Sequence, residues 1–330
     1  MIQHPAIIAL LSSATIICLM VAYAAYYGIK IITGWDLHSG SEQQLMLERR
    51  TYLISTVICY AMGFQLISLF LLIYTADTLH PLFTGAMCAA GSLGANAFGY
   101  PLLLLKVANA IFAGVWLLIN RLDSKGYDYP LIRSKYALLI FLALLLAVET
   151  GLQFSYFLNL KADLITSCCG SLFSSASRGI AGELAAAPAK PMIFIFAGSA
   201  LFLLASYSYS ITRRRGWYLF ATASLLFFVI ATVSLISFIS LYFYELPTHH
   251  CPFCILQSEY NHIGYLLYVC LLGGIIAGGG VGAAESFKKC SSLQEIIPGF
   301  QRRAASVGIL FSGSFVVVVL ARIFTTSFRL

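Results

Sequence analysis

The stretch YALLIFLALLLAVETGLQFSYFLN, Tyr136–Asn159, decides the fold class of this chain. Its apolar residues follow one another without the alternation of a half-buried strand, and Glu149 is its one charged residue. A helix of about 20 residues crosses a hydrocarbon core of about 30 Å. Such a helix also satisfies its own backbone hydrogen bonds where no water is present. The stretch is therefore predicted to be a transmembrane helix.

The composition of the whole chain extends this prediction. Of its 330 residues, 60% are hydrophobic and 10% are charged, whereas a soluble protein carries about 25% charged residues. The chain therefore cannot be an ordinary soluble protein or a disordered one. The predicted spans lie near 6–30, 52–74, 101–120, 136–159, 191–212, 217–244, 264–284 and 304–324. We expect one all-α domain over residues 1–330, a polytopic transmembrane bundle of about eight helices.

The basic residues predict the orientation of the bundle. Connections on one side hold Arg49, Arg50, Arg121, Lys125, Arg133, Lys135, Arg213, Arg214, Arg215, Lys288, Lys289, Arg302 and Arg303. The opposite connections, 75–100, 160–190 and 245–263, hold Lys161, Arg178 and Lys190. Because cytoplasmic loops are rich in Lys and Arg, these three connections and both termini are expected on the external face of the cell membrane.

That face is periplasmic or extracellular, and in a Gram-negative cell the membrane is the inner one. The N-terminal sequence lacks the features of a cleaved signal peptide, so the first span is expected to be retained. The net charge of +7 is then explained by orientation and by contact with anionic membrane lipids. Nucleic acid is not an expected partner.

The cysteines concentrate in the three external connections. Those of the apolar spans are read as inert: Cys18, Cys59 and Cys270. The external ones are Cys88, Cys168, Cys169, Cys251 and Cys254, and four histidines accompany them: His80, His249, His250 and His262. Thiols and imidazoles gathered on one membrane face favour a functional site.

The segment HHCPFCILQSEYNHIGY, 249–265, carries the strongest functional signal. Cys251 and Cys254 are expected at the start of the next helix, where the helix dipole and the pair His249 and His250 stabilise a thiolate. A thiolate there favours disulfide exchange. Ligation of a metal or cofactor and a structural disulfide are the alternatives.

CPFC followed by an apolar helix resembles the vitamin K epoxide reductase family and the quinone-linked membrane proteins that generate disulfides. The resemblance covers about twenty residues. It implies that Cys251 and Cys254 form the redox-active disulfide beside a quinone, and that Cys168 and Cys169 stand loosely in place of the shuttle pair. The function expected first is therefore a membrane thiol–disulfide oxidoreductase that acts on an external thiol protein, with Cys88 as a further relay.

Two other functions remain open. Soft ligands could bind copper or zinc, and the candidate set is Cys88, Cys168, Cys169, His250, Cys251 and Cys254. His249, His250 and His262 are also candidates for binding a cofactor. The third possibility is a non-catalytic subunit of a larger membrane complex. Under the first two functions, the external cysteines are expected to converge on one site.

A polar group inside the membrane is a second candidate site. Glu149 and Gln153 are four residues apart, so they share a helix face, and so do Lys106 and Asn109. Intramembrane charges are costly and mark functional sites. Lys106 lies near its helix end, where a lysine commonly extends to the interface. A Glu149–Lys106 pair or a protonatable Glu149 that serves a redox cofactor is the alternative, and a helix-packing contact is the simplest explanation.

Overall fold

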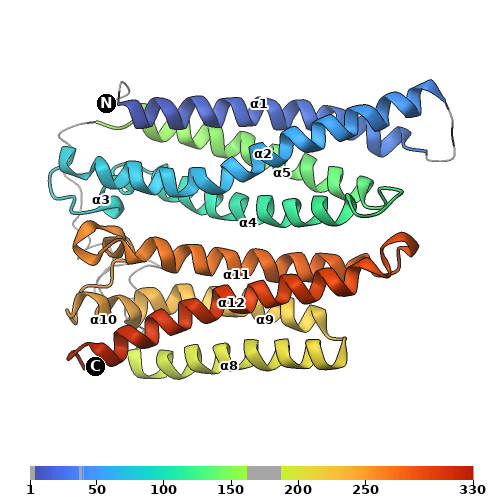
Figure 1. Cartoon of the computed structure of the whole chain (residues 1–330). Helices are drawn as coiled ribbons and strands as arrows, with labels where there is room; N and C mark the ends of the chain where they lie inside the picture. The colour runs from blue at the N-terminus through green and yellow to red at the C-terminus, as the bar shows by residue number, and fades with distance from the viewer. Residues whose placement is uncertain (1–3, 37–38, 40, 162–186, 330) are drawn as a thin grey trace. The chain divides into compact units, whose positions relative to one another are not determined.

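A computed structural model describes residues 4–36, 39, 41–161 and 187–329 (Figure 1). Eight of its helical segments are long and apolar enough to cross a membrane, which confirms the all-α class and a helix at each of the eight predicted spans. The segments are Pro5–Gly34, Glu42–Leu82, Gly99–Asp123, Ile132–Leu158, Ala189–Arg213, Trp217–Tyr244, Ile263–Ser286 and Ile296–Thr325. The orientation of the termini stays a prediction.

Several helices are longer than the predicted spans. Helix α1 (Pro5–Gly34) and helix α2 (Glu42–Thr78) both continue past the hydrocarbon-length stretch, and α12 (Ile296–Thr325) begins before it. Hydropathy detects the apolar part of a helix alone, so polar turns at helix ends are missed. Large apolar side chains point outward, with Leu104 70% and Phe194 77% exposed, as is typical of helices in contact with lipid.

The internal contacts of the chain divide it into two compact units. The single domain expected from the sequence stays a prediction. Unit 1 comprises 1–72, 97–160 and 283–301, and unit 2 comprises 73–96, 161–282 and 302–330. In unit 1, α1 packs against α5 (Ile132–Leu158), which also packs against α4 (Gly99–Asp123). Trp116 and Tyr136 are fully buried in its core.

Unit 2 contains the short helix α3 (Ala89–Leu93), α8 (Ala189–Arg213), α9 (Trp217–Ser234), α10 (Ser240–Tyr244), most of α11 (Ile263–Ser286) and most of α12. A π-helical turn, Leu235–Ile239, joins α9 to α10. The core of unit 2 is aromatic: Phe196 packs against Phe227, Phe238 and Phe315, with ring centroids 5.9–6.1 Å apart. Such pairs stabilise a core beyond the area that they bury.

The glycines of α11 let neighbouring helices approach closely. A Cβ atom on Gly274 would lie 2.5 Å from the Ser312 hydroxyl of α12, and one on Gly278 would lie 2.4 Å from the Ser224 Cβ of α9. Helices in lipid associate by close van der Waals packing, which small residues permit. The glycine-rich run 273–282 is therefore a packing surface.

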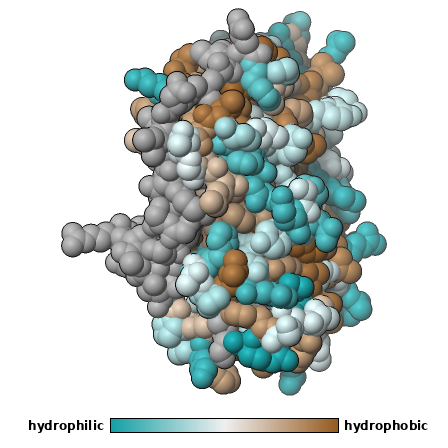
Figure 2. All heavy atoms as spheres, turned by 90° about the vertical axis from the view of Figure 1, so that its left-hand side faces the viewer, coloured by the Kyte–Doolittle hydropathy of each residue, from teal (hydrophilic) through white to brown (hydrophobic). Residues whose placement is uncertain are grey.

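Figure 2 looks onto the end of the helices at which α3 and the start of α11 lie. Hydrophilic and hydrophobic side chains are intermixed on this end.

Candidate functional site

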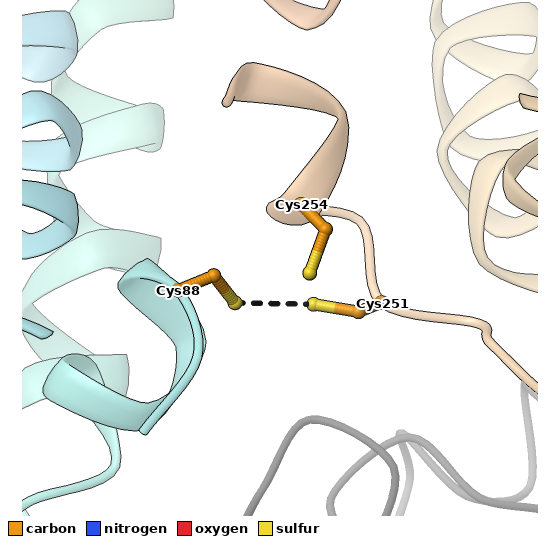
Figure 3. A group of neighbouring side chains, drawn as sticks. All are labelled: Cys88, Cys251 and Cys254. Carbon is orange, nitrogen blue, oxygen red and sulfur yellow. Dashed lines mark hydrogen bonds between the residues drawn. The ribbon is translucent and has the colours of Figure 1, made fainter. Parts of the chain in front are cut away.

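Three cysteines of unit 2 converge on one point. The Sγ atoms of Cys88, Cys251 and Cys254 all lie within 4.8 Å of one another, and Figure 3 shows the three side chains pointing toward a common centre. The Cys88 and Cys251 sulfur atoms are 3.6 Å apart. Cys88 and Cys251 are 0% exposed and Cys254 is 5% exposed. The expected convergence is thus confirmed for two of the three cysteine groups.

The end of α2 positions Cys88. Cys88 is the residue that precedes α3, with an extended backbone. The backbone N–H of Ala89 donates a hydrogen bond of 3.1 Å to Asp77 Oδ1, and Asp77 lies in the last turn of α2. Because Ala89 is the next residue, this bond fixes the backbone that carries the Cys88 sulfur.

Two tyrosines hold the turn that carries the other two sulfurs. The Tyr244 hydroxyl donates to the Cys251 carbonyl at 2.5 Å, and the Tyr268 hydroxyl donates to the Pro252 carbonyl at 2.6 Å. Tyr244 ends α10 and Tyr268 lies in α11. The Cys251–Pro252 backbone is therefore fixed from two helices, so that the sulfur positions are not left to a loop alone.

The expected place of the CPFC segment at a helix start is wrong. Cys254 begins a 3-10 turn, Cys254–Leu256, a second 3-10 turn follows, and α11 starts at Ile263. Asn261 and His262 intervene with φ of 52° and 54°, the left-handed region in which an α-helix cannot continue. The dipole of α11 therefore does not act on the CPFC thiols as expected.

A close approach of backbones places this turn against α11. A Cβ atom on Gly264 would lie 2.7 Å from Ile255 Cγ2 and 2.9 Å from the Ile255 carbonyl oxygen. The His262 ring nitrogen Nδ1 donates to the Leu256 carbonyl at 2.7 Å, which stabilises the left-handed residue. Only glycine at position 264 leaves room for the turn.

One carboxamide joins the segments that carry the sulfurs. Gln257 Nε2 donates to the Met87 carbonyl at 2.8 Å and to Asp77 Oδ1 at 3.3 Å. Met87 precedes Cys88, and Gln257 is three residues after Cys254. The same Asp77 oxygen thus holds both the α3 side and the CPFC side of the cluster.

Replacing Gln257 by leucine is expected to loosen the cluster, because both hydrogen bonds are lost at a cost of about 1–3 kcal/mol. Oxidative cross-linking measures the change: the yield of a Cys88–Cys251 disulfide is expected to fall several-fold. Ser258→Ala is the matched control, since the Ser258 hydroxyl contacts its exposed neighbour Glu259. An unchanged disulfide yield in Gln257→Leu would show that the hydrogen bonds of Gln257 do not position the sulfurs.

The histidines hold backbone segments in the described structure. His250 Nδ1 donates to the Ile236 carbonyl of the π-helical turn at 3.0 Å, and His80 Nδ1 donates to the Asp77 carbonyl at 2.5 Å. The His249 ring packs edge-on against Tyr244, with centroids 4.6 Å apart. Neither His249, His250 nor His262 belongs to the group of ligand atoms around the sulfurs; their binding of a cofactor or metal stays a prediction.

Two predicted site residues, Cys168 and Cys169, lie outside the described residues.

Tyr260 lies next to the cysteine cluster. Burial, and then the neighbouring Cys254, raises the pKa of its hydroxyl, so Tyr260 is a neutral phenol at physiological pH.

Glu149 lies at the centre of a buried polar network in unit 1. Gln65 Nε2 donates to both of its oxygens, at 2.8 and 2.7 Å. Lys106 Nζ donates to Oε1 and Asn109 Nδ2 to Oε2, each at 2.6 Å. Lys106 also reaches Gln153 Oε1 at 3.2 Å. Lys106 is 1% and Glu149 2% exposed, so Lys106 pairs with Glu149 and does not extend to the interface.

Sequence reasoning missed several residues that build the cysteine site. None of the motifs pointed to Asp77, Tyr244, Gln257 or Tyr268, because their roles depend on contacts with distant backbone. The one available signal was the position of Gln257 shortly after CPFC. The disulfide Cys251–Cys254 and the role of Glu149 in binding a cofactor stay predictions.

Comparisons with protein-family models, with curated proteins and with solved structures found no match. The resemblance to quinone-linked disulfide-generating proteins therefore rests on the CPFC segment alone.

Proposed function

We propose that this multi-pass membrane protein binds a soft metal ion, copper(I), through the thiolates of Cys88, Cys251 and Cys254. The observation that carries the proposal is the approach of three buried Sγ atoms to within 4.8 Å of one another. A CxxC pair that acts alone needs two sulfurs. The third, from a segment 163 positions before Cys251, makes a ligand set.

The sulfur distances support a shared ion. A metal–thiolate bond is about 2.3 Å long, so two sulfurs on one ion lie at most about 4.6 Å apart. The sulfurs of a disulfide lie about 2.05 Å apart. The Cys88–Cys251 distance of 3.6 Å agrees with the first arrangement, and small side-chain rotations would bring all three sulfurs to one ion.

The number and kind of ligands favour copper(I) over zinc. Thiolates are soft ligands that select copper(I) and zinc, and structural zinc is almost always held by four protein ligands. Among the described residues, no fourth His, Cys, Asp or Glu belongs to the group. A copper(I) ion accepts three thiolates, so the described set is complete for copper and one short for a structural zinc site.

Copper binding by the full-length, reduced protein in detergent tests the proposal. Competition with a coloured copper(I) chelator, in the absence of oxygen, is expected to give one tightly bound ion per chain. Cys88→Ser, Cys251→Ser and Cys254→Ser should each weaken the affinity at least tenfold, because each removes one of three bonds. X-ray absorption should show a shell of sulfur near 2.3 Å.

Cys270→Ser and Cys290→Ser are the controls, because these cysteines do not belong to the cluster. The double variant Cys168→Ser/Cys169→Ser tests the cysteines outside the described residues. Unchanged copper affinity in Cys88→Ser, or loss of copper in the Cys168/Cys169 double variant alone, would contradict the proposed ligand set.

Thiol–disulfide exchange is the second candidate function. The contact between Cys88 and Cys251 favours it, because the Cys88 thiolate could attack Sγ of Cys251 in a Cys251–Cys254 disulfide. A Cys88–Cys251 bond would form and Cys254 would leave as the thiolate, with no net oxidation. Net formation of a disulfide from two thiols requires a two-electron acceptor, and a quinone is the class expected.

Thiol trapping separates the two functions. In membranes quenched with acid and labelled with an alkylating reagent, exchange predicts a mixture of Cys251–Cys254 and Cys88–Cys251 disulfides by mass spectrometry. The mixture should shift toward thiols when quinone is depleted. Copper binding predicts three thiols that are protected by the ion and become reactive when copper is removed.

A further inference from the structure

Two adjoining cavities lie along α1 and α2 in unit 1 and share Tyr27 and Arg50. One has a volume of about 330 Å³, and its lining is mainly apolar: Met20, Leu53, Val57 and Ile58. The other has a volume of about 610 Å³, and most of its lining residues carry polar groups, among them Lys30, Thr33, Asp36, Gln43 and Gln44. An apolar groove thus continues into a polar chamber at the residues where α1 and α2 leave the apolar part of the bundle.

Arg50 lies where the cavities meet, and a second cation, Lys30, lines the polar chamber. Arg50 Nη1 donates to the Tyr27 hydroxyl at 2.6 Å, and its guanidinium lies 5.1 Å from the centre of the same ring. Lys30 Nζ lies 4.5 Å from the centre of the Tyr26 ring. Among the described residues, the ion pairs include neither Lys30 nor Arg50, and Asp36 is the one acidic residue of either lining. The site therefore carries excess positive charge.

We propose that these cavities bind one anionic phospholipid, with its phosphate at Arg50 and Lys30 and an acyl chain in the apolar groove. A guanidinium binds phosphate through two parallel hydrogen bonds. Basic pockets between transmembrane helices bind anionic headgroups, and tyrosines are typical of the membrane interface. The charge of the chamber and the apolar lining of the groove together match a lipid, whereas a free anion would need the chamber alone.

The combined length of the two cavities also matches a lipid. From Lys30 in the chamber to Met20 in the groove is about 15 Å along α1, at 1.5 Å per residue. Half of a hydrocarbon core of about 30 Å is also about 15 Å. Chamber and groove together therefore extend from the level of a phosphate to about the middle of the bilayer, the depth that one leaflet occupies.

Native mass spectrometry of the full chain tests the proposal. Phosphatidylglycerol and phosphatidylcholine with identical chains are added to the detergent-solubilised protein, and the bound fractions are compared. The wild type is expected to retain phosphatidylglycerol at least fivefold better. The variant Lys30→Gln/Arg50→Gln should lose this preference, and Val57→Trp, which fills the groove, should lower the retention of both lipids.

Arg49→Gln is the matched control, because Arg49 is an exposed neighbour that lines neither cavity; it should keep the preference. Melting temperatures and helical content show whether each variant is folded. If Arg49→Gln and Arg50→Gln lose the preference for phosphatidylglycerol equally, diffuse surface charge and not this site attracts the lipid. If millimolar inorganic phosphate displaces the lipid and Val57→Trp leaves the retention of both lipids unchanged, a lipid is not the occupant.

Discussion

Replacement of Lys106 by methionine is expected to lower the free energy of unfolding by about 3–5 kcal/mol, because removal of one partner leaves a buried charge without its counterion. Glu149 is 2% exposed and its Oε1 lies 2.6 Å from Lys106 Nζ. The remaining donors, Gln65 and Asn109, are neutral amides. Unfolding in mixed detergent micelles, followed by circular dichroism, measures the loss.

A double-variant cycle separates the ion pair from simple packing. Lys106→Met/Glu149→Gln removes both charges. Its decrease in the free energy of unfolding should therefore be smaller than the sum of the two single decreases by at least about 1 kcal/mol. Lys288→Met is the control, because Lys288 pairs with Glu285 at 3.0 Å while its side chain is 46% exposed, and surface pairs contribute about 0–1 kcal/mol. Additive losses would show that the charges do not stabilise each other.

Replacement of Gly278 by leucine is expected to cost about 3 kcal/mol, the upper part of the range for overpacked interiors. A Cβ atom at this position would lie 2.4 Å from the Ser224 Cβ, so α9 and α11 must move apart and lose their contact. The same unfolding measurement detects the change.

Two variants test whether the clash is the cause. Gly313→Leu on α12 should keep or slightly raise stability, because nothing lies within 4 Å of a Cβ at Gly313 and leucine favours helix more than glycine. The smaller replacement Gly278→Ala should also lower the stability. Adding Ser224→Gly to it should recover part of that loss, since this removes the atoms that collide. If Gly278→Leu is as stable as Gly313→Leu, α9 and α11 do not pack as described.

The eight long apolar helices are a property that the sequence by itself determined. An apolar run of about 20 residues has one stable form in hydrocarbon, a helix, because its backbone has no other hydrogen-bond partners. Local spacing also determined which polar residues share a face, as Glu149 does with Gln153. These inferences depend on neighbours within a few residues, and that information is complete in the sequence.

The tertiary structure alone decided which faces meet and where the cysteine turn lies. Glu149 shares no local pattern with Gln65, yet the two are hydrogen bonded. Cys88 and Cys251 are separated by 163 positions and their sulfurs are 3.6 Å apart. Such contacts depend on how helices pack and how connections cross their ends, which no short pattern encodes. Hydropathy could predict that the thiols share a membrane face; only packed helices, fixed by Asp77 and Gln257, bring them to one point.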